Sequence, residues 1–125
     1  MGKNETMGFE HLTILQIRYL TELEQMETGR GTIGAIAEKC GVKHPTVSRF
    51  FKSCIEKEYL TQSLDFTEKG QMMLQRHQKV VRDVREYLER SGITEGIDDV
   101  LKGMVENIDY IRLEELARSH MRVNK

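Results

Sequence analysis

Three features of this 125-residue sequence predict a mainly α-helical fold. The spacing of small residues over 33–51 is typical of a helix-turn-helix, and two short extended runs after Glu58 indicate a very short β-hairpin wing. Apolar residues at helical spacing from Gln71 onward predict C-terminal dimerisation helices. The expected architecture is a winged helix-turn-helix followed by a helical dimerisation region.

The helix-turn-helix prediction depends on the segment IGAIAEKCGVKHPTVSRFF, residues 33–51. Ala37 is small enough for two helices to cross closely, and Gly41 can adopt the positive φ of a tight turn. Val47 is then placed to pack the second helix against the first. Pro45 suits the first position of that second helix, because its missing N–H is not needed there.

Three helices are expected in the N-terminal half of the chain. The first covers about 12–26, where apolar residues recur at helical spacing, and Thr13 is its expected cap. A glycine-rich loop then leads to Thr32, which is expected to cap a second helix over 33–40. The third helix opens at Pro45 and is expected to end near Lys57.

The expected wing consists of two strand-like runs, 59–61 and 64–67, separated by Gln62 and Ser63. The connecting residues lack the glycine that a tight two-residue turn prefers. Thr67 is expected to cap the helix that follows. The wing is therefore expected to be short and to make little contact with a minor groove.

The C-terminal half shows helical periodicity with few interruptions. A long amphipathic helix is expected over 71–90 and ends at Gly92, a second begins at Thr94 or Glu95, and a short one lies around Leu113. The expected organisation is a flexible N-terminal tail (1–9), a winged helix-turn-helix DNA-binding domain (10–70), a helical dimerisation region (71–117) and a polar C-terminal tail (118–125).

Composition favours a cytoplasmic location. No apolar run approaches the roughly eighteen residues of a membrane span, and the N-terminal segment MGKNETMGFE has no export pattern. Cys40 and Cys54 form neither a CxxC pair nor a disulfide framework, which favours a reducing compartment. We find no HExxH, GxSxG or phosphate-loop motif, so we expect neither an enzyme nor a required cofactor.

Charge is distributed unevenly, although the net charge is only −1. Residues 43–57 contain Lys43, Arg49, Lys52 and Lys57 but only one acid, whereas residues 1–28 and 93–117 are acidic. This basic segment coincides with the second helix of the helix-turn-helix. The pattern predicts double-stranded DNA as the partner, bound in a salt-dependent way.

Individual DNA-binding roles follow from the expected helix. Arg49 is expected to read a base, because its guanidinium can bond the O6 and N7 atoms of guanine together. Phosphate contacts that set the register are expected from Lys43, His44 and Lys52. The full set of expected DNA-binding residues is Lys43, His44, Pro45, Thr46, Ser48, Arg49 and Lys52, with Gln62 and Ser63 in the wing.

The stretch GAIAEKCGVKHPTVSRFFKSCIEKEYL, followed by FTEKG, resembles the winged helix of the diphtheria-toxin-repressor and manganese-repressor family. The tail VVRDVREYLERSGIT…IDDVLKGMVENIDYIRLEEL is similar to that family's dimerisation region. This resemblance implies a cytoplasmic homodimer that binds a palindromic operator, most simply as a repressor. It also implies that the protein binds its operator when it holds iron or manganese.

The metal site is where the sequence departs from that family. The resemblance places the usual ligand positions on Gln16, Tyr19, Val81, Lys102, Val105 and Glu106. Of these, only Glu106 is a good ligand for a hard divalent ion. His77 and His11 are weak further candidates, and His77 would have to recruit a partner such as Glu10. We therefore expect DNA binding that does not depend on metal.

Two alternatives stay open. The run Leu12-Thr13-x-x-Gln16 resembles repressors of the multiple-antibiotic-resistance type, which respond to phenolic ligands or thiol oxidation. Thiol sensing would need an exposed cysteine with a depressed pKa, whereas Cys40 and Cys54 occupy positions expected to be buried. A winged helix can also act as a protein–protein interaction module. The sequence does not identify a small-molecule effector, the operator or the regulated genes.

Overall fold

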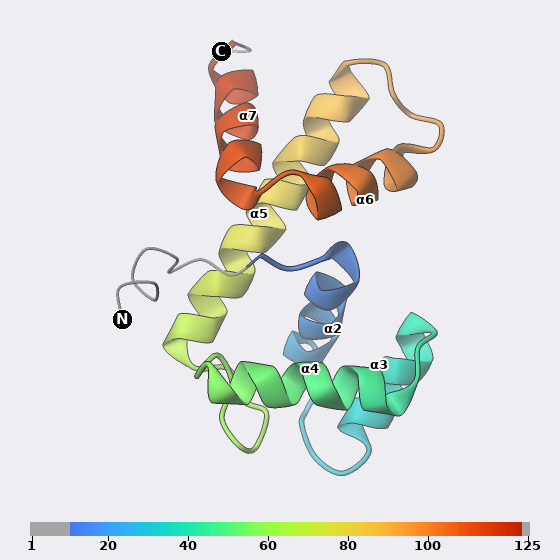
Figure 1. Ribbon diagram of the computed structural model, residues 1–125, viewed down its shortest axis with the longest axis vertical. Coiled ribbons are helices and arrows are strands. Elements are labelled where there is room, and N and C mark those ends of the chain that lie inside the picture. The colour runs from blue at the N-terminus through green and yellow to red at the C-terminus, as the bar shows by residue number, and fades with distance from the viewer. Residues whose placement is uncertain (1–10, 124–125) are drawn as a thin grey trace. The chain divides into compact units, whose positions relative to one another are not determined.

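A computed structural model describes residues 11–123, and their side chains as far as Ser119 (Figure 1). The tail expected over 1–9, together with Glu10 and residues 124–125, lies outside the described residues. The described part is mainly helical, with α2 (Ile14–Glu24), α3 (Thr32–Cys40), α4 (His44–Glu56), α5 (Glu68–Arg90), α6 (Ile97–Asn107) and α7 (Tyr110–Val123). Between residues 11 and 123, every helix is too short or too polar to cross a membrane.

These helices form two compact units. The first unit is 15–75; among the described residues, the second is 11–14 together with 76–123. The division therefore lies inside α5, between Gln75 and Arg76.

The first unit is built around three helices whose apolar residues recur on one side. The helices α3 and α4 pack against each other, as the expected helix-turn-helix requires (Figure 1). Because apolar side chains recur every three or four residues, each helix can bury one face and leave the other to solvent. The buried side chains are Ile17, Tyr19, Leu20 and Leu23 on α2, Ile36 and Ala37 on α3, and Val47, Phe51 and Cys54 on α4.

The turn between α3 and α4 has the predicted glycine geometry. Gly41 has φ 69°, and its N–H donates to the carbonyl of Glu38 at 3.2 Å. The N–H of Val42 donates to the carbonyl of Ala37 at 3.0 Å. These two bonds form a Schellman motif, which satisfies the last carbonyls of α3 and needs a left-handed residue at its centre.

Two expected helix starts differ from the observed ones. Thr32 is not a cap but the first residue of α3; the capping position belongs to Gly31, with φ 85°. The Thr32 hydroxyl instead accepts a hydrogen bond from the N–H of Gly29 at 2.8 Å. The helix α4 begins at His44, so that Pro45 is its second residue rather than its first, because Lys43 already holds the extended backbone of a capping residue.

The expected wing lacks its strands within the described residues. Only an isolated antiparallel bridge joins Leu60 and Phe66, where we expected strands over 59–61 and 64–67. The hydroxyl of Thr61 accepts hydrogen bonds from the N–H groups of Ser63 and Asp65 at 3.2 and 3.1 Å. Because these donors are satisfied locally, the pairing of strands stops after one bridge.

The predicted cap of α5 is present, although the helix begins at Glu68 and not at Gln71. The hydroxyl of Thr67 accepts a hydrogen bond from the N–H of Gly70 at 3.0 Å, which is the contact of a capping threonine. The helix ends before Gly92, which has φ 92° and leads into a second Schellman motif.

The second unit contains the C-terminal part of α5 with α6 and α7. Its core is formed by Leu12, by Val80, Val84 and Leu88 on α5, by Leu101 and Val105 on α6, and by Tyr110, Leu113 and Ala117 on α7. The helix α6 begins later than Thr94 or Glu95, because Gly96 is left-handed with φ 71°. The helix α7 is longer than the short helix expected around Leu113, and it continues through 118–123, which we had assigned to a polar tail.

Candidate nucleic-acid interface

The orientation of α4 is fixed by its buried side. Val47, Phe51 and Cys54 are almost completely inaccessible to solvent, with Val47 at 0% exposure. These positions are three or four residues apart and therefore share one face of the helix. The opposite face of α4 is turned to solvent.

The structure brings most of the predicted DNA-binding residues to that exposed face and to the start of α4. Ser48 is the exception in the helix: it is only half-exposed, because it follows the fully buried Val47 and lies on the edge of the buried face. The exposed residues of the predicted set on this helix and its capping position are Lys43, His44, Pro45, Thr46, Arg49 and Lys52.

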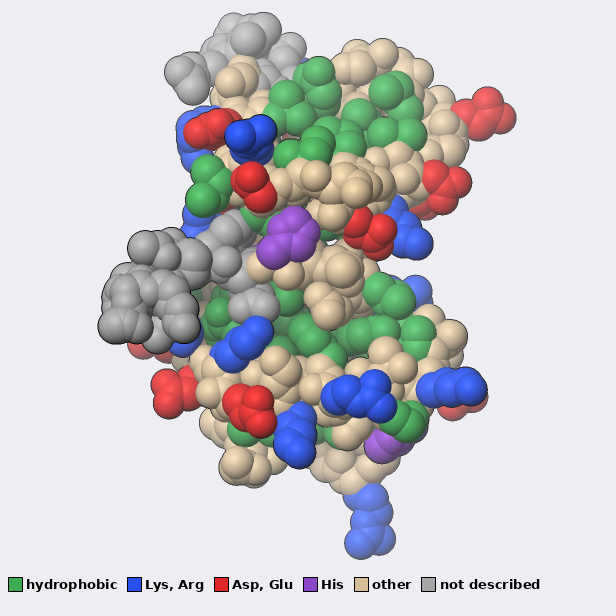
Figure 2. Space-filling view, in the orientation of Figure 1, with side chains coloured by type: hydrophobic (Ala, Val, Ile, Leu, Met, Phe, Trp, Pro, Cys, Tyr) green, Lys and Arg blue, Asp and Glu red, His purple; other side chains and the backbone are tan. Residues whose placement is uncertain are grey.

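The cations of this face are not neutralised by the surrounding residues. Within residues 11–119, Lys43, Arg49 and Lys52 have no acidic partner within ion-pair distance, whereas Lys39 on the neighbouring α3 pairs with Glu22 at 2.9 Å. Figure 2 shows Lys and Arg side chains gathered over α4. The face is therefore free to attract phosphate groups electrostatically.

The N-terminal end of α4 adds to this positive character. Lys43 makes no side-chain hydrogen bond to the helix, and the first turn of α4 contains no acidic residue. The exposed N–H groups at a helix start carry a partial positive charge and can bind phosphate oxygens. Since Lys43 and His44 are exposed at the same end, charge and hydrogen-bond donors coincide there.

The loop that replaces the wing presents its predicted residues at an exposed tip. Gln62 and Ser63 are both exposed, in the turn organised by Thr61. Asp65, two residues after that tip, accepts a hydrogen bond from the Thr28 hydroxyl at 3.4 Å, which ties the loop to the segment before α3. The tip is thus polar and accessible.

Sequence reasoning missed a further cation beside this loop. The ammonium of Lys69 donates to the backbone carbonyl of Lys57 at 3.1 Å and lies 5.1 Å from the centre of the Tyr59 ring. Lys57 is the C-cap residue of α4, so Lys69 brings positive charge to the C-terminal end of that helix. The sequence indicated the start of α5 after Thr67, but no sequence pattern revealed the contact of Lys69 with Lys57.

The weak metal candidates are not assembled into a site. His77 is completely buried, with its ring 4.2 Å from that of Tyr110, and the ring of His11 is 5.1 Å from the same tyrosine. Glu106 is exposed on α6. Among the described residues, no three His, Cys, Asp or Glu side chains are close enough together to hold a metal ion. Metal independence stays a prediction.

The two cysteines differ in burial, although both were expected to be buried. Cys54 is buried in the core of the first unit, and Cys40 is half-buried at the end of α3. Burial raises the pKa of the Cys40 thiol, with the nearby carboxylate of Glu22 adding to the effect against the opposing charges of Arg18 and Lys39. A thiol sensor needs a lowered pKa, so this environment does not favour thiol sensing.

No protein-family model, curated protein or solved structure matches this chain.

Proposed function

We propose that this protein is a sequence-specific DNA-binding transcriptional regulator in which α4 is the recognition helix. The observation that carries the proposal is the exposed face of α4, where Lys43, Arg49 and Lys52 have no acidic partner among the described residues. On the neighbouring α3, by contrast, Lys39 is paired with Glu22. A face left positive is suited to a polyanion.

The proposed docking places α4 in the major groove. Arg49 lies on the exposed face, in the second turn of α4, where a guanidinium can reach a guanine edge. Lys43 and His44, at the helix start, contact phosphates together with the first N–H groups of α4. Lys52 contacts a phosphate further along. The loop carrying Gln62 and Ser63 acts as a minimal wing.

The regulator is further proposed to act as a homodimer on a palindromic operator, as a repressor in the cytoplasm. A single recognition helix reads only a few base pairs, and a two-fold pair of helices one turn of DNA apart doubles that information. DNA binding is proposed to need neither iron nor manganese. Affinity measured with and without a chelator tests this last point, because strong activation by either ion would contradict it.

The experiment that tests DNA binding is a salt titration with matched charge variants. Fluorescence anisotropy of a labelled random duplex is measured over a range of salt for the wild-type chain, Arg49→Gln/Lys52→Gln and Arg82→Gln/Lys102→Gln. Each double variant removes one arginine and one lysine at exposed positions. The α4 variant is expected to lower affinity for the random duplex and to reduce the salt slope by about one, because the phosphate contact of Lys52 is lost.

The control variant is expected to bind as the wild type does. Equal losses in the two double variants would mean that binding follows total charge and not the α4 face. No binding by the wild type at low salt would reject the DNA proposal, and a protein–protein interaction module would then be the better interpretation.

A further inference from the structure

A groove with charged walls lies in the second unit, between α5 and α7. Its volume is about 420 Å³, which is within the range of clefts that hold small molecules. Val80 and Ala117 line it but are each only 4% exposed, so most of its apolar surface belongs to the carbon stems of the charged lining residues. The charged lining residues are Arg76, Lys79, Asp83, Glu114 and Arg118.

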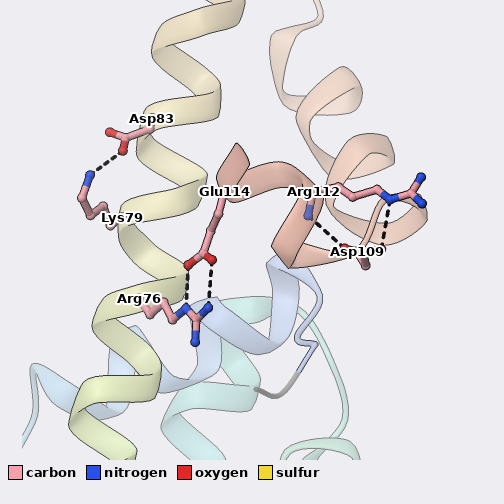
Figure 3. A network of polar contacts seen from close by, with 6 residues as sticks. All are labelled: Arg76, Lys79, Asp83, Asp109, Arg112 and Glu114. Atoms are coloured by element: carbon pink, nitrogen blue, oxygen red, sulfur yellow. Dashed lines mark hydrogen bonds and ion pairs between the residues drawn. The ribbon is translucent and has the colours of Figure 1, made fainter. Parts of the chain in front are cut away.

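Both carboxylates of the groove are already paired. The Arg76 guanidinium holds Glu114 through two hydrogen bonds, Nε to Oε2 at 2.6 Å and Nη2 to Oε1 at 2.8 Å (Figure 3). Along α5, the Lys79 ammonium donates to Asp83 at 2.7 Å. An ammonium has three N–H donors, so the bond from Lys79 to Asp83 leaves donors of Lys79 for a ligand.

Arg118 is the lining cation that takes part in neither of these two ion pairs. It is exposed, and within residues 11–119 it has no acidic partner at ion-pair distance. Arg118 and Glu114 both line the groove and are four residues apart on α7, so they share one face of that helix. The charge of Arg118 adds to the lowering of the pKa of Glu114, after the larger effect of the hydrogen bond from Arg76. Three cations against two carboxylates give the lining a net charge of +1.

We propose that this groove binds a small monocarboxylate with a compact apolar body. The carboxylate pairs with Arg118, for which a planar two-oxygen anion is the matching partner. The apolar body packs over Val80 and Ala117 and along the carbon stems of the charged lining residues, so that one end of the ligand is held by charge and the other by apolar contact. The site is separate from α4, and its occupancy does not depend on the proposed DNA binding.

The test uses three probes that share one ring and differ in charge. The ¹⁵N-labelled full chain is titrated with benzoate, benzamide and benzylamine, and the amide shifts are followed by NMR. Benzoate is expected to give saturable shifts at groove residues of α5 and α7. Benzamide is expected to bind about tenfold more weakly, since it lacks the charge, and benzylamine to give no saturable shift.

Arg118→Gln is the informative variant, because residue 118 is exposed and its loss leaves the core intact. It is expected to weaken benzoate about tenfold, to the level of benzamide. Arg112→Gln is the matched control, since Arg112 is also exposed on α7 but does not line the groove. Absence of a saturable benzoate shift, binding of benzylamine as tight as benzoate, or unchanged benzoate affinity in Arg118→Gln would each overturn the proposal.

Discussion

Gly70 lies where the first turn of α5 meets the backbone of Tyr59. A Cβ at this position would approach the Tyr59 carbonyl oxygen to 2.0 Å, far inside van der Waals contact. That carbonyl is held in place, because it accepts hydrogen bonds from the N–H and the hydroxyl of Thr67 at 3.1 and 3.2 Å. The chain therefore cannot absorb a methyl group here by moving a flexible side chain.

Gly70→Ala is expected to destabilise the first unit by about 3 kcal/mol, because backbone must move to admit the methyl group. Urea unfolding followed by circular dichroism measures the change. Gly103→Ala is the matched control: Gly103 lies inside α6 with nothing within 4 Å of the added Cβ, so alanine should stabilise by about 1 kcal/mol. A Gly70→Ala chain as stable as the wild type would contradict the close approach.

Residues with a positive φ at helix ends were only partly predictable from the sequence. Gly41 and Gly92 were predicted to end helices, and both have a positive φ in a Schellman motif. Glu58 ends α4 in the same way, with φ 66° and hydrogen bonds from Glu58 to Ile55 and from Tyr59 to Cys54. No sequence rule identifies a glutamate at such a position, because the penalty is overcome by packing around Tyr59 and Cys54, which are buried in the first unit.

At the scale of elements, α4 was the most predictable part of the chain. Val47, Phe51 and Cys54 recur at helical spacing, so its buried face could be assigned from sequence, and the exposed positions of Arg49 and Lys52 followed. The wing was less predictable. The residues of 59–67 favour an extended backbone, but the Thr61 hydroxyl accepts hydrogen bonds from N–H groups that a pair of strands would need. Whether the hydroxyl or the opposite strand binds these N–H groups depends on the fold of the turn.

Two substitutions on α4 separate base reading from phosphate binding. Arg49→Ala is expected to lose about 1–3 kcal/mol of binding free energy for the operator and little for scrambled DNA, because a bidentate contact to guanine would be lost. Lys52→Ala is expected to weaken binding to both DNAs equally and to reduce the salt slope by about one. Competition binding with the two duplexes measures the ratio. An unchanged ratio in Arg49→Ala would remove Arg49 from the reading face.

The ion pair between α5 and α7 should make the second unit sensitive to acid. The hydrogen bond from Arg76 holds the pKa of Glu114 below its usual value, and the Glu114 side chain is only 16% exposed. A carboxylate with a lowered pKa in the folded state stabilises the fold above its unfolded pKa. That contribution is lost as the pH falls through the folded pKa.

Glu114→Gln is therefore expected to cost up to about 1 kcal/mol near neutral pH, since Arg76 is partly solvent-exposed and its interaction is screened. The difference from wild type should shrink toward zero as the pH falls through the lowered folded pKa of Glu114, because the carboxyl is then protonated in both states. Urea unfolding over a descending series of pH values measures it. Glu115→Gln, at the exposed neighbouring position, is the control and should cost little at every pH of the series. If Glu114→Gln lowers the free energy of unfolding by the same amount at every pH, the ion pair with Arg76 is not the cause of the loss.

At the scale of the whole molecule, the proposed regulator needs a second copy to read a palindrome. Exposed large apolar side chains are the natural contacts of such an interface. In the second unit, Val100 on α6 is 39% exposed and Ile111 on α7 is 55% exposed. Both fall within 71–117, where the sequence predicted dimerisation.

We expect the chain to be a dimer at micromolar concentration by size-exclusion chromatography with light scattering. Val100→Glu/Ile111→Glu is expected to shift it to a monomer, because each carboxylate buried in an apolar contact raises the dissociation constant of the dimer more than about tenfold. Leu15→Glu, at an exposed apolar position of α2, is the control and should stay dimeric. The monomeric variant should still bind random DNA but lose its preference for a palindrome over a half-site, because its α4 is intact and only the pairing of two recognition helices is lost. A wild-type monomer would remove the dimer from the proposal, whereas a dimeric double variant would place the interface on another surface.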